Sequence, residues 1–278
     1  VRTVSTVVTG SSTTGIKSYI QNAYDNWDSP PEYVLLVGDV DEIPTFSFYG
    51  NPSDQIYVQL QGDDWLMDAM IGRLPVETEI EARALVNKTI NYERSPDLAG
   101  DATWQTRALM VAGVYASDTP GYTVDFCGER LQDLGFPSPT TVTSPPLPSL
   151  QGAVVVRATI NAGVGFVVYR GWAYGTAGWD PPSFTVDDIP ALDTNNMTPI
   201  VMSFVCLNGD YTASTACFGE SFVRQGTADE PGKGAVAFIG NGEHWSHTRY
   251  NDAMAISIFE RIVDEDVTDL GSLLNSGK

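Results

Sequence analysis

Short apolar runs recur along the second half of the chain, and turn residues follow each of them. The runs occupy 107–113, 166–169, 200–205 and 235–239. Runs of this length are typical of strands in a parallel sheet, because helices cover both faces of such a sheet. Helices are expected over 125–134 and 154–161, with a connection rich in Pro, Ser and Thr between them at 137–149. The pattern predicts an α/β domain.

Three of these predicted strands end in loops that carry polar or reactive residues. The loops are 170–172, 206–209 and 240–244. The carboxyl ends of parallel strands meet at one edge of the sheet, and α/β proteins assemble their active sites at that edge. We therefore expect the residues of these three loops to form one site.

The first hundred residues show the same alternation on a smaller scale. Helical spacing over 16–24 precedes the run 33–37, which we expect to be a strand buried on both faces. A strand is predicted over 69–75 and an amphipathic helix over 77–93. The Pro, Gly and Asp residues of 95–101 indicate an internal boundary. We expect two closely packed subdomains, 1–100 and 101–278, each with a mostly parallel sheet covered by helices.

The charge of the chain restricts its partners. It contains 15 Lys and Arg against 35 Asp and Glu, which gives a net charge of −20. A surface of this sign repels nucleic acids and anionic membranes, so peptides, small molecules and cations remain. No apolar run is long enough to insert into a membrane. The start at Val1, without Met or a signal-type segment, is interpreted as a processed or trimmed chain.

The chain has three cysteines, and with an odd number at least one is not in an internal disulfide. Cys206 ends an apolar run and precedes the turn 207–209. A thiol at such a strand end is accessible to reactants, which favours a reactive cysteine. The alternative is a small buried hydrophobic residue. That alternative is the better interpretation of Cys127 and Cys217, which lie in helix-like contexts.

Several segments resemble the gingipain-type cysteine endopeptidases, over roughly residues 16 to 260. The similar segments are 33–39, 43–44, 53–57, 62–64, 71–75, 89–94, 205–211, 217–220 and 234–240, followed by Trp245. The resemblance implies a caspase-like three-layer α/β/α fold with a mostly parallel sheet. It also implies that the thiolate of Cys206 attacks a peptide carbonyl while backbone amides near Gly171 and Cys206 hold the oxyanion. It further implies a secreted or cell-surface protein with other domains in a longer chain.

One position departs from the family pattern. The family carries its catalytic His in a Gly-His-Gly turn, and Trp172 occupies that position here. An indole has no basic nitrogen, so it cannot accept the thiol proton. The chain has two histidines, His244 and His247, in the loop after 235–239. His244 is a candidate substitute base, and the alternative is a histidine at the pocket rim beside Trp245.

The resemblance also suggests how substrates and metals bind. The family holds a P1 Arg or Lys with an acidic residue, for which Asp118 and Asp125 are the candidates, with Trp245 as an aromatic wall. Either carboxylate is alternatively a solvated surface group. The chemistry requires no cofactor, and no metal ligands are assigned. Structural Ca²⁺ is a compositional prediction from oxygen ligands of the family's kind. The carboxylates that offer such oxygens are Asp39, Asp54, Asp63, Asp64 and Asp68.

The sequence leaves three functional interpretations open. The first is a cysteine endopeptidase domain that cleaves after Arg or Lys and is impaired by loss of the usual His. The second is a catalytically inactive pseudopeptidase that acts as a peptide-binding or structural module. The third is a structural domain of a larger surface protein.

Overall fold

The computed structural model describes residues 1–95, 100–115 and 117–276, and its largest element is a five-stranded parallel sheet. The strands are β5 (Ala108–Gly113), β6 (Thr140–Ser144), β7 (Phe166–Arg170), β10 (Ile200–Phe204) and β11 (Ala237–Gly240). Their order across the sheet is β11-β10-β7-β5-β6, and every neighbouring pair is parallel. Four of these strands lie where the apolar runs predicted them.

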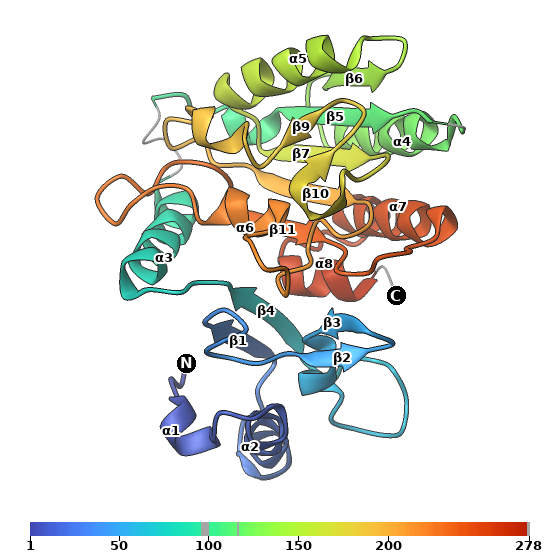
Figure 1. Ribbon diagram of the computed structural model, residues 1–278. Helices are drawn as coiled ribbons and strands as arrows, with labels where there is room; N and C mark the ends of the chain where they lie inside the picture. Colours follow the sequence, from blue (N-terminus) through green and yellow to red (C-terminus); the bar gives the residue numbers. More distant parts are fainter. Residues whose placement is uncertain (96–99, 116, 277–278) are drawn as a thin grey trace.

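Helices cover both faces of this sheet and complete a three-layer α/β/α domain (Figure 1). One face packs its valines, such as Val111 and Val167, against α5 (Ser149–Asn161) and α6 (Phe218–Val223). The opposite face packs Met110 and Met202 against three helices. These helices are α4 (Thr119–Asp133), α7 (Thr248–Asp264) and α8 (Leu270–Ser276). Successive side chains of a strand point to opposite faces, so a continuous apolar run supplies both cores.

Three predictions about the larger half need correction. The helix expected over 125–134 begins at Thr119, because Pro120 occupies a first-turn position where its missing N–H costs nothing. The helix expected from 154 begins at Ser149, directly after Pro148. Strand β6 lies inside the segment interpreted as a connection. It is an edge strand with exposed threonines, and therefore it lacks an apolar run.

The N-terminal half contains a smaller parallel sheet of β1 (Tyr33–Val37) and β4 (Met70–Leu74). The prediction that 33–37 is buried on both faces is wrong: Leu36 is buried, whereas Tyr33, Leu35 and Val37 are exposed. In the described residues, the core of this half packs against α2 (Thr13–Asn26), and α8 packs on β4. The remaining elements of this half are α1 (Thr6–Thr9), β2 (Phe46–Phe48), β3 (Asn51–Ser53) and the 3-10 helix η1 (Gln55–Val58).

Helix α3 (Glu79–Arg94) connects the two halves and packs beside α6 (Figure 1). Its Lys88 is buried and donates to the carbonyl oxygens of Val223, Gln225 and Ala235 at 2.7, 2.8 and 3.2 Å. The smaller sheet precedes 95 and the larger one follows 101, although 96–99 of the expected junction lie outside the described residues.

Short elements cross the surface between the main strands. They are η3 (Trp104–Thr106), η4 (Gly175–Ala177), β8 (Gly178–Trp179), β9 (Phe184–Thr185) and η5 (Ile189–Ala191). None of the helices in the described part of the chain combines the length and hydrophobicity that crossing a membrane requires.

Candidate functional site

The carboxyl edge of the large sheet has a topological switch point between β5 and β7. The chain leaves β5 toward β6 on one side and returns to β7 on the other. Open α/β sheets bind ligands in the crevice at such a point. The loops that follow β5 and β7 meet here, since Trp172 Nε1 donates to the carbonyl oxygen of Tyr115 at 3.4 Å and the two rings pack edge to face.

Cys206 follows β10, the strand beside β7, and lies at the same edge. Its side chain is partly exposed, and the next residue, Leu207, has a φ of 63°. A branched residue in this left-handed region is strained, and such strain persists where surrounding contacts enforce it, often at functional sites. The enforcing contacts come from the loop after β11: Leu207 N donates to Glu243 O at 3.1 Å, and Gly209 N donates to Asn241 O at 2.9 Å.

A buried polar chain fixes the Cys206 turn against the loop after β7. Trp179 Nε1 donates to Ser203 Oγ at 2.9 Å, and Ser203 Oγ donates to Asn208 Oδ1 at 2.8 Å. Asn208 Nδ2 in turn donates to the carbonyl oxygens of Gly175 and Gly178 at 3.2 and 3.1 Å. This role of Asn208 was not predicted from the sequence. The available signal was Ser203, a polar residue within an otherwise apolar strand.

Cys206 differs from the other two cysteines of the chain in being partly exposed. Burial raises the pKa of the Cys217 thiol to about 12, and burial raises that of Cys127 still further. Cys206 Sγ instead lies 3.2 Å from Ser246 Oγ, in the loop after β11. The prediction that loops at this edge converge is therefore confirmed for 206–209 and 240–244, while Ser246 itself was not foreseen.

The two histidines have other partners than the thiol in the described residues. The exposed ring of His244 packs edge to face on Trp245, and its backbone N–H donates to Asn51 Oδ1 at 3.2 Å. His247 caps α7, where its Nδ1 accepts from Arg249 N at 3.2 Å. In the described residues, neither imidazole hydrogen bonds to Cys206. The structure thus places the ring of His244 against Trp245, and its role as a substitute base stays a prediction.

Trp172 and Gly171 form the turn that the family pattern assigns to the base. Trp172 is half-exposed, and its backbone is held by the buried Tyr169 hydroxyl, which donates to Trp172 O at 2.7 Å and accepts from Trp172 N at 2.9 Å. Gly171 lies so close to Tyr169 that a Cβ would come within 2.4 Å of the hydroxyl oxygen. Glycine is therefore required at 171, and the turn is rigid apart from the indole.

The candidate acidic residues differ in position. Asp118 is exposed at the N-cap of α4, three residues after Tyr115 and therefore near the switch point. Asp125 is exposed about two turns further along the helix. Asp118 therefore lies closer along the chain than Asp125 to the loop that follows β5.

The carboxylates suggested as calcium ligands have other partners. Asp39 pairs with Arg224 at 2.6 Å and Asp54 with Arg73 at 2.7 Å. Asp64 and Asp68 accept from backbone amides, and Asp63 is exposed. Across 1–95, 100–115 and 117–276, no three His, Cys, Asp or Glu side chains are arranged to hold a metal. Calcium binding stays a prediction.

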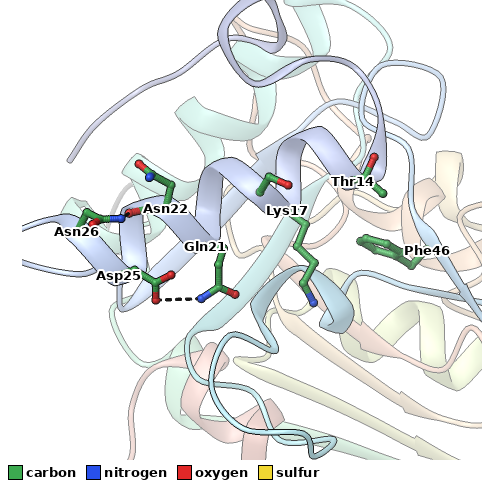
Figure 2. A pocket seen from close by; sticks show the side chains of 8 residues that line it. Thr14, Lys17, Gln21, Asn22, Asp25, Asn26 and Phe46 are labelled. Carbon is green, nitrogen blue, oxygen red and sulfur yellow. Dashed lines mark hydrogen bonds between the residues drawn. The ribbon is translucent and has the colours of Figure 1, made fainter.

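The chain also has grooves away from the sheet edge. Figure 2 shows one of about 460 Å³ along α2, where Thr14, Lys17, Gln21, Asp25 and Phe46 lie on its wall. Lys17 Nζ is engaged by the carbonyl oxygen of Ile56 at 2.6 Å. Another groove of about 530 Å³ lies at the amino end of β5. Neither contains Cys206, Trp172 or the candidate acids, so the sheet edge is the candidate site.

Comparison with known proteins identifies a family profile over the whole chain and relatives over most of it. The profile of Peptidase family C25 matches residues 1–278. Gingipain R2 and Gingipain R1 of Porphyromonas gingivalis are each 29% identical over 232 residues, which is 81% of this chain but 30% and 22% of those proteins. The chain therefore spans less than a third of the curated relatives it matches.

Solved structures share the fold. The crystal structure of the Arg specific cysteine proteinase gingipain R (RGPB) superposes with a TM-score of 0.86 at 23% identity, covering 96% of this chain and 62% of that one. A complex of the Porphyromonas gingivalis RgpB pro- and mature domains gives a TM-score of 0.84 at 22% identity, covering 96% of this chain and 63% of that one. The expected caspase-like α/β architecture is confirmed.

Proposed function

Because the chain belongs to peptidase family C25, we propose that it is a cysteine endopeptidase domain that uses Cys206 as its nucleophile and turns over slowly. The observation that carries the proposal is the position of Cys206. It is the partly exposed cysteine, it follows β10 at the carboxyl edge, and its turn is held in a strained conformation beside the switch point. Strained, exposed turns at sheet edges are where α/β enzymes place nucleophiles.

The proposed reaction begins with attack of the Cys206 thiolate on the peptide carbonyl carbon, which forms a C–S bond and an oxyanion. Backbone amides near Gly171 and Cys206 are suitable donors to that oxyanion. When the C–N bond breaks, the leaving amine takes a proton and a thioester remains, which water then hydrolyses. Trp172 cannot supply the proton, so it comes from water, and the step is slow because no positioned acid assists it.

We propose Arg or Lys as the P1 residue. Asp118 at the N-cap of α4 and the exposed Trp245 on the other side of the edge supply a carboxylate and an aromatic face, both of which attract cations. The net charge of −20 also attracts cationic peptides. A solved relative with this fold is described as Arg specific, which supports the same preference here.

The test is hydrolysis of a fluorogenic peptide with Arg at P1, using the parent protein and Cys206→Ala. We expect slow turnover by the parent and background turnover by the variant. The Cys217→Ala variant is the matched control, because Cys217 is buried and should not affect the rate. Equal rates for the parent and Cys206→Ala would overturn the peptidase proposal.

A second function is favoured by one specific observation. In the described residues Cys206 has no imidazole partner, and a half-exposed indole occupies the family's base position. A pseudopeptidase that binds peptides at the same edge accounts for both features. It predicts that the Arg peptide binds to Cys206→Ala and to the parent with equal affinity, and that neither protein cleaves it.

The remaining proposals concern the setting of the domain. The curated relatives are more than three times the length of the matched segment, which supports further domains in a longer chain. We propose a secreted or cell-surface location and protein substrates, as the resemblance to gingipains implies. Calcium titration of the folded protein, with thermal stability as the readout, tests the structural calcium proposal.

A further inference from the structure

We propose that Ser246 donates a hydrogen bond to the Cys206 thiolate and that Asn251 and Asn241 hold Ser246 in the donating orientation. The inference rests on the assignment of Cys206 as nucleophile and adds groups that act on it in the absence of an imidazole. Ser246 touches the reacting sulfur, whereas the two asparagines act through Ser246 and are positioning residues.

The direction of the hydrogen bonds follows from the donors and acceptors. Asn241 Nδ2 donates to Asn251 Oδ1 at 2.6 Å, which orients the amide so that its NH₂ group faces the other way. Asn251 Nδ2 then donates to Ser246 Oγ at 3.0 Å. A serine hydroxyl has one proton, and with its oxygen accepting from Asn251 that proton is available to Cys206 Sγ, 3.2 Å away.

This arrangement favours the charged form of the sulfur. A hydrogen bond donated to an anion stabilises it relative to the neutral group, and donors in series polarise one another. The carbonyl oxygen of Ser246 lies 3.8 Å from the sulfur and accepts from the protonated thiol, so it acts in the opposite sense. The contact with the hydroxyl is the shorter of the two, at 3.2 Å against 3.8 Å.

The chain of donors is anchored within the fold. Asn251 is buried on the first turns of α7, with 4% of its surface exposed. Asn241 lies at the far end of the chain of donors. Its backbone carbonyl oxygen also accepts from Gly209 N at 2.9 Å. The same loop that imposes the strained turn on Cys206 thus supplies the hydroxyl, and both parts of the nucleophile's environment are positioned together.

Other charged groups near the thiol must be separated from this effect. They lie on the loop after β11, on the Cys206 turn, on α7 and at the end of β7. Asp252 on α7 and Arg170 at the end of β7 form an ion pair. These groups are Glu243, His244, His247, Asp210, Asp252 and Arg170. Removing both imidazoles confines the comparison to the hydroxyl and the two asparagines. A background that carries His244→Ala and His247→Ala contains no imidazole at all.

The experiment measures the rate of Cys206 alkylation by iodoacetamide from about pH 5 to 10 in this histidine-free background. The rate follows the thiolate fraction, so the pH of half-maximal rate reports how strongly the thiolate is stabilised. We expect Ser246→Ala to raise this pH by about one unit, since a lost hydrogen bond to an anion is worth roughly that amount. Ser246→Thr keeps the hydroxyl and should leave the midpoint near the parent value.

A second variant keeps the proposal testable if Ser246→Ala does not fold. Asn241→Ala removes the far end of the chain and should shift the midpoint in the same direction by a smaller amount. An unchanged or lowered midpoint in either folded variant would overturn the inference. Alkylation needs no turnover, so a parent protein without peptidase activity that still shows the midpoint shift would refute the proposed function and leave the role of Ser246 standing.

Discussion

Cys206 is partly exposed to water, whereas the other two cysteines are buried. Cys127 lies on the buried face of α4 and Cys217 is the buried N-cap of α6. Burial raises the pKa of both, because an apolar environment disfavours the thiolate. At neutral pH these two thiols are therefore protonated as well as inaccessible.

We predict that a small alkylating agent at neutral pH labels Cys206 at least about tenfold faster than either buried cysteine, because access and thiolate fraction set the rate. Mass spectrometry of peptides from a labelling time course measures the three rates in one sample. Cys206→Ser is the control for background labelling. Equal rates at all three positions would contradict the assignment of Cys206 as the reactive thiol.

Placing a histidine at position 172, the family's base position, is expected to increase peptidase activity. Trp172 occupies the turn at the end of β7, and a positioned general base is typically worth about 10²- to 10⁴-fold. We expect Trp172→His to raise turnover of an Arg-containing fluorogenic peptide substantially, while His244→Ala in the parent changes it little. Trp172→Phe is the matched control, because it removes the indole without supplying a base. Loss of turnover in His244→Ala would show that His244 is the working base.

Substrate preference tests the two carboxylates. Because Asp118 lies near the switch point and Asp125 lies further along α4, we predict that Asp118→Asn reduces the preference for Arg over Leu at P1 by roughly tenfold or more, the cost of an unpaired substrate charge. Asp125→Asn serves as the comparison and should have little effect. A library of P1 peptides measures both variants. An apolar preference that neither substitution changes would refute basic specificity.

At the scale of an element, α3 carries a buried amine against the end of α6. Lys88 is held by three carbonyl oxygens, and burial lowers its pKa from 10.5 to about 7. Between these two values the unfolded chain binds a proton that the folded chain does not. The free energy of unfolding therefore rises with pH across this range, by at most about 1.4 kcal/mol per pH unit.

We predict that Lys88→Met removes this pH dependence, because its side chain has a similar length and no proton to bind. Urea unfolding at about pH 7 and about pH 9 measures the slope in both proteins, below the range where tyrosines ionise. Arg83→Met on the exposed face of α3 is the control and should keep the parent slope. A parent protein whose stability falls between these pH values would contradict the prediction.

At the scale of the whole molecule, one arginine links the two halves. Arg224, at the end of α6, donates to Asp39 and Glu220 at 2.6 and 2.7 Å, and to the carbonyl oxygen of Pro75 at 2.5 Å. Helix α8 also packs on β4, and Arg73 stacks over the ring of Tyr211 from the Cys206 loop. The small sheet is therefore tied to the loop that carries the nucleophile.

We expect Arg224→Met to lower the free energy of unfolding by about 2 to 4 kcal/mol, because it leaves the carboxylates of Glu220 and Asp39 facing each other without a cation. Burial already raises the pKa of Glu220, which shows how little water reaches it. Chemical unfolding measures the change. Arg261→Met, in an exposed pair with Glu265, is the control and should cost less than about 1 kcal/mol. Equal effects of the two substitutions would contradict the role of the cluster.

The sequence alone determined the parallel sheet and the position of Cys206. Strands buried on both faces leave a continuous apolar run whatever their neighbours are, so four of the five large-sheet strands were predictable. Edge strand β6 was not, because its solvent-facing threonines leave no such run. The exposed face of β1 was predicted incorrectly for a related reason: an apolar run does not show how many layers cover it.

Tertiary structure decided which groups meet at the thiol. Ser246 and Asn251 are 40 and 45 positions after Cys206, and hydrogen bonding across such separations leaves no periodic trace in a sequence. The same applies to His244, which shares a loop with Ser246 yet packs its ring on Trp245. The strand order determines at which edge of the sheet a loop lies. The direction of each side chain depends instead on packing between segments distant in the chain.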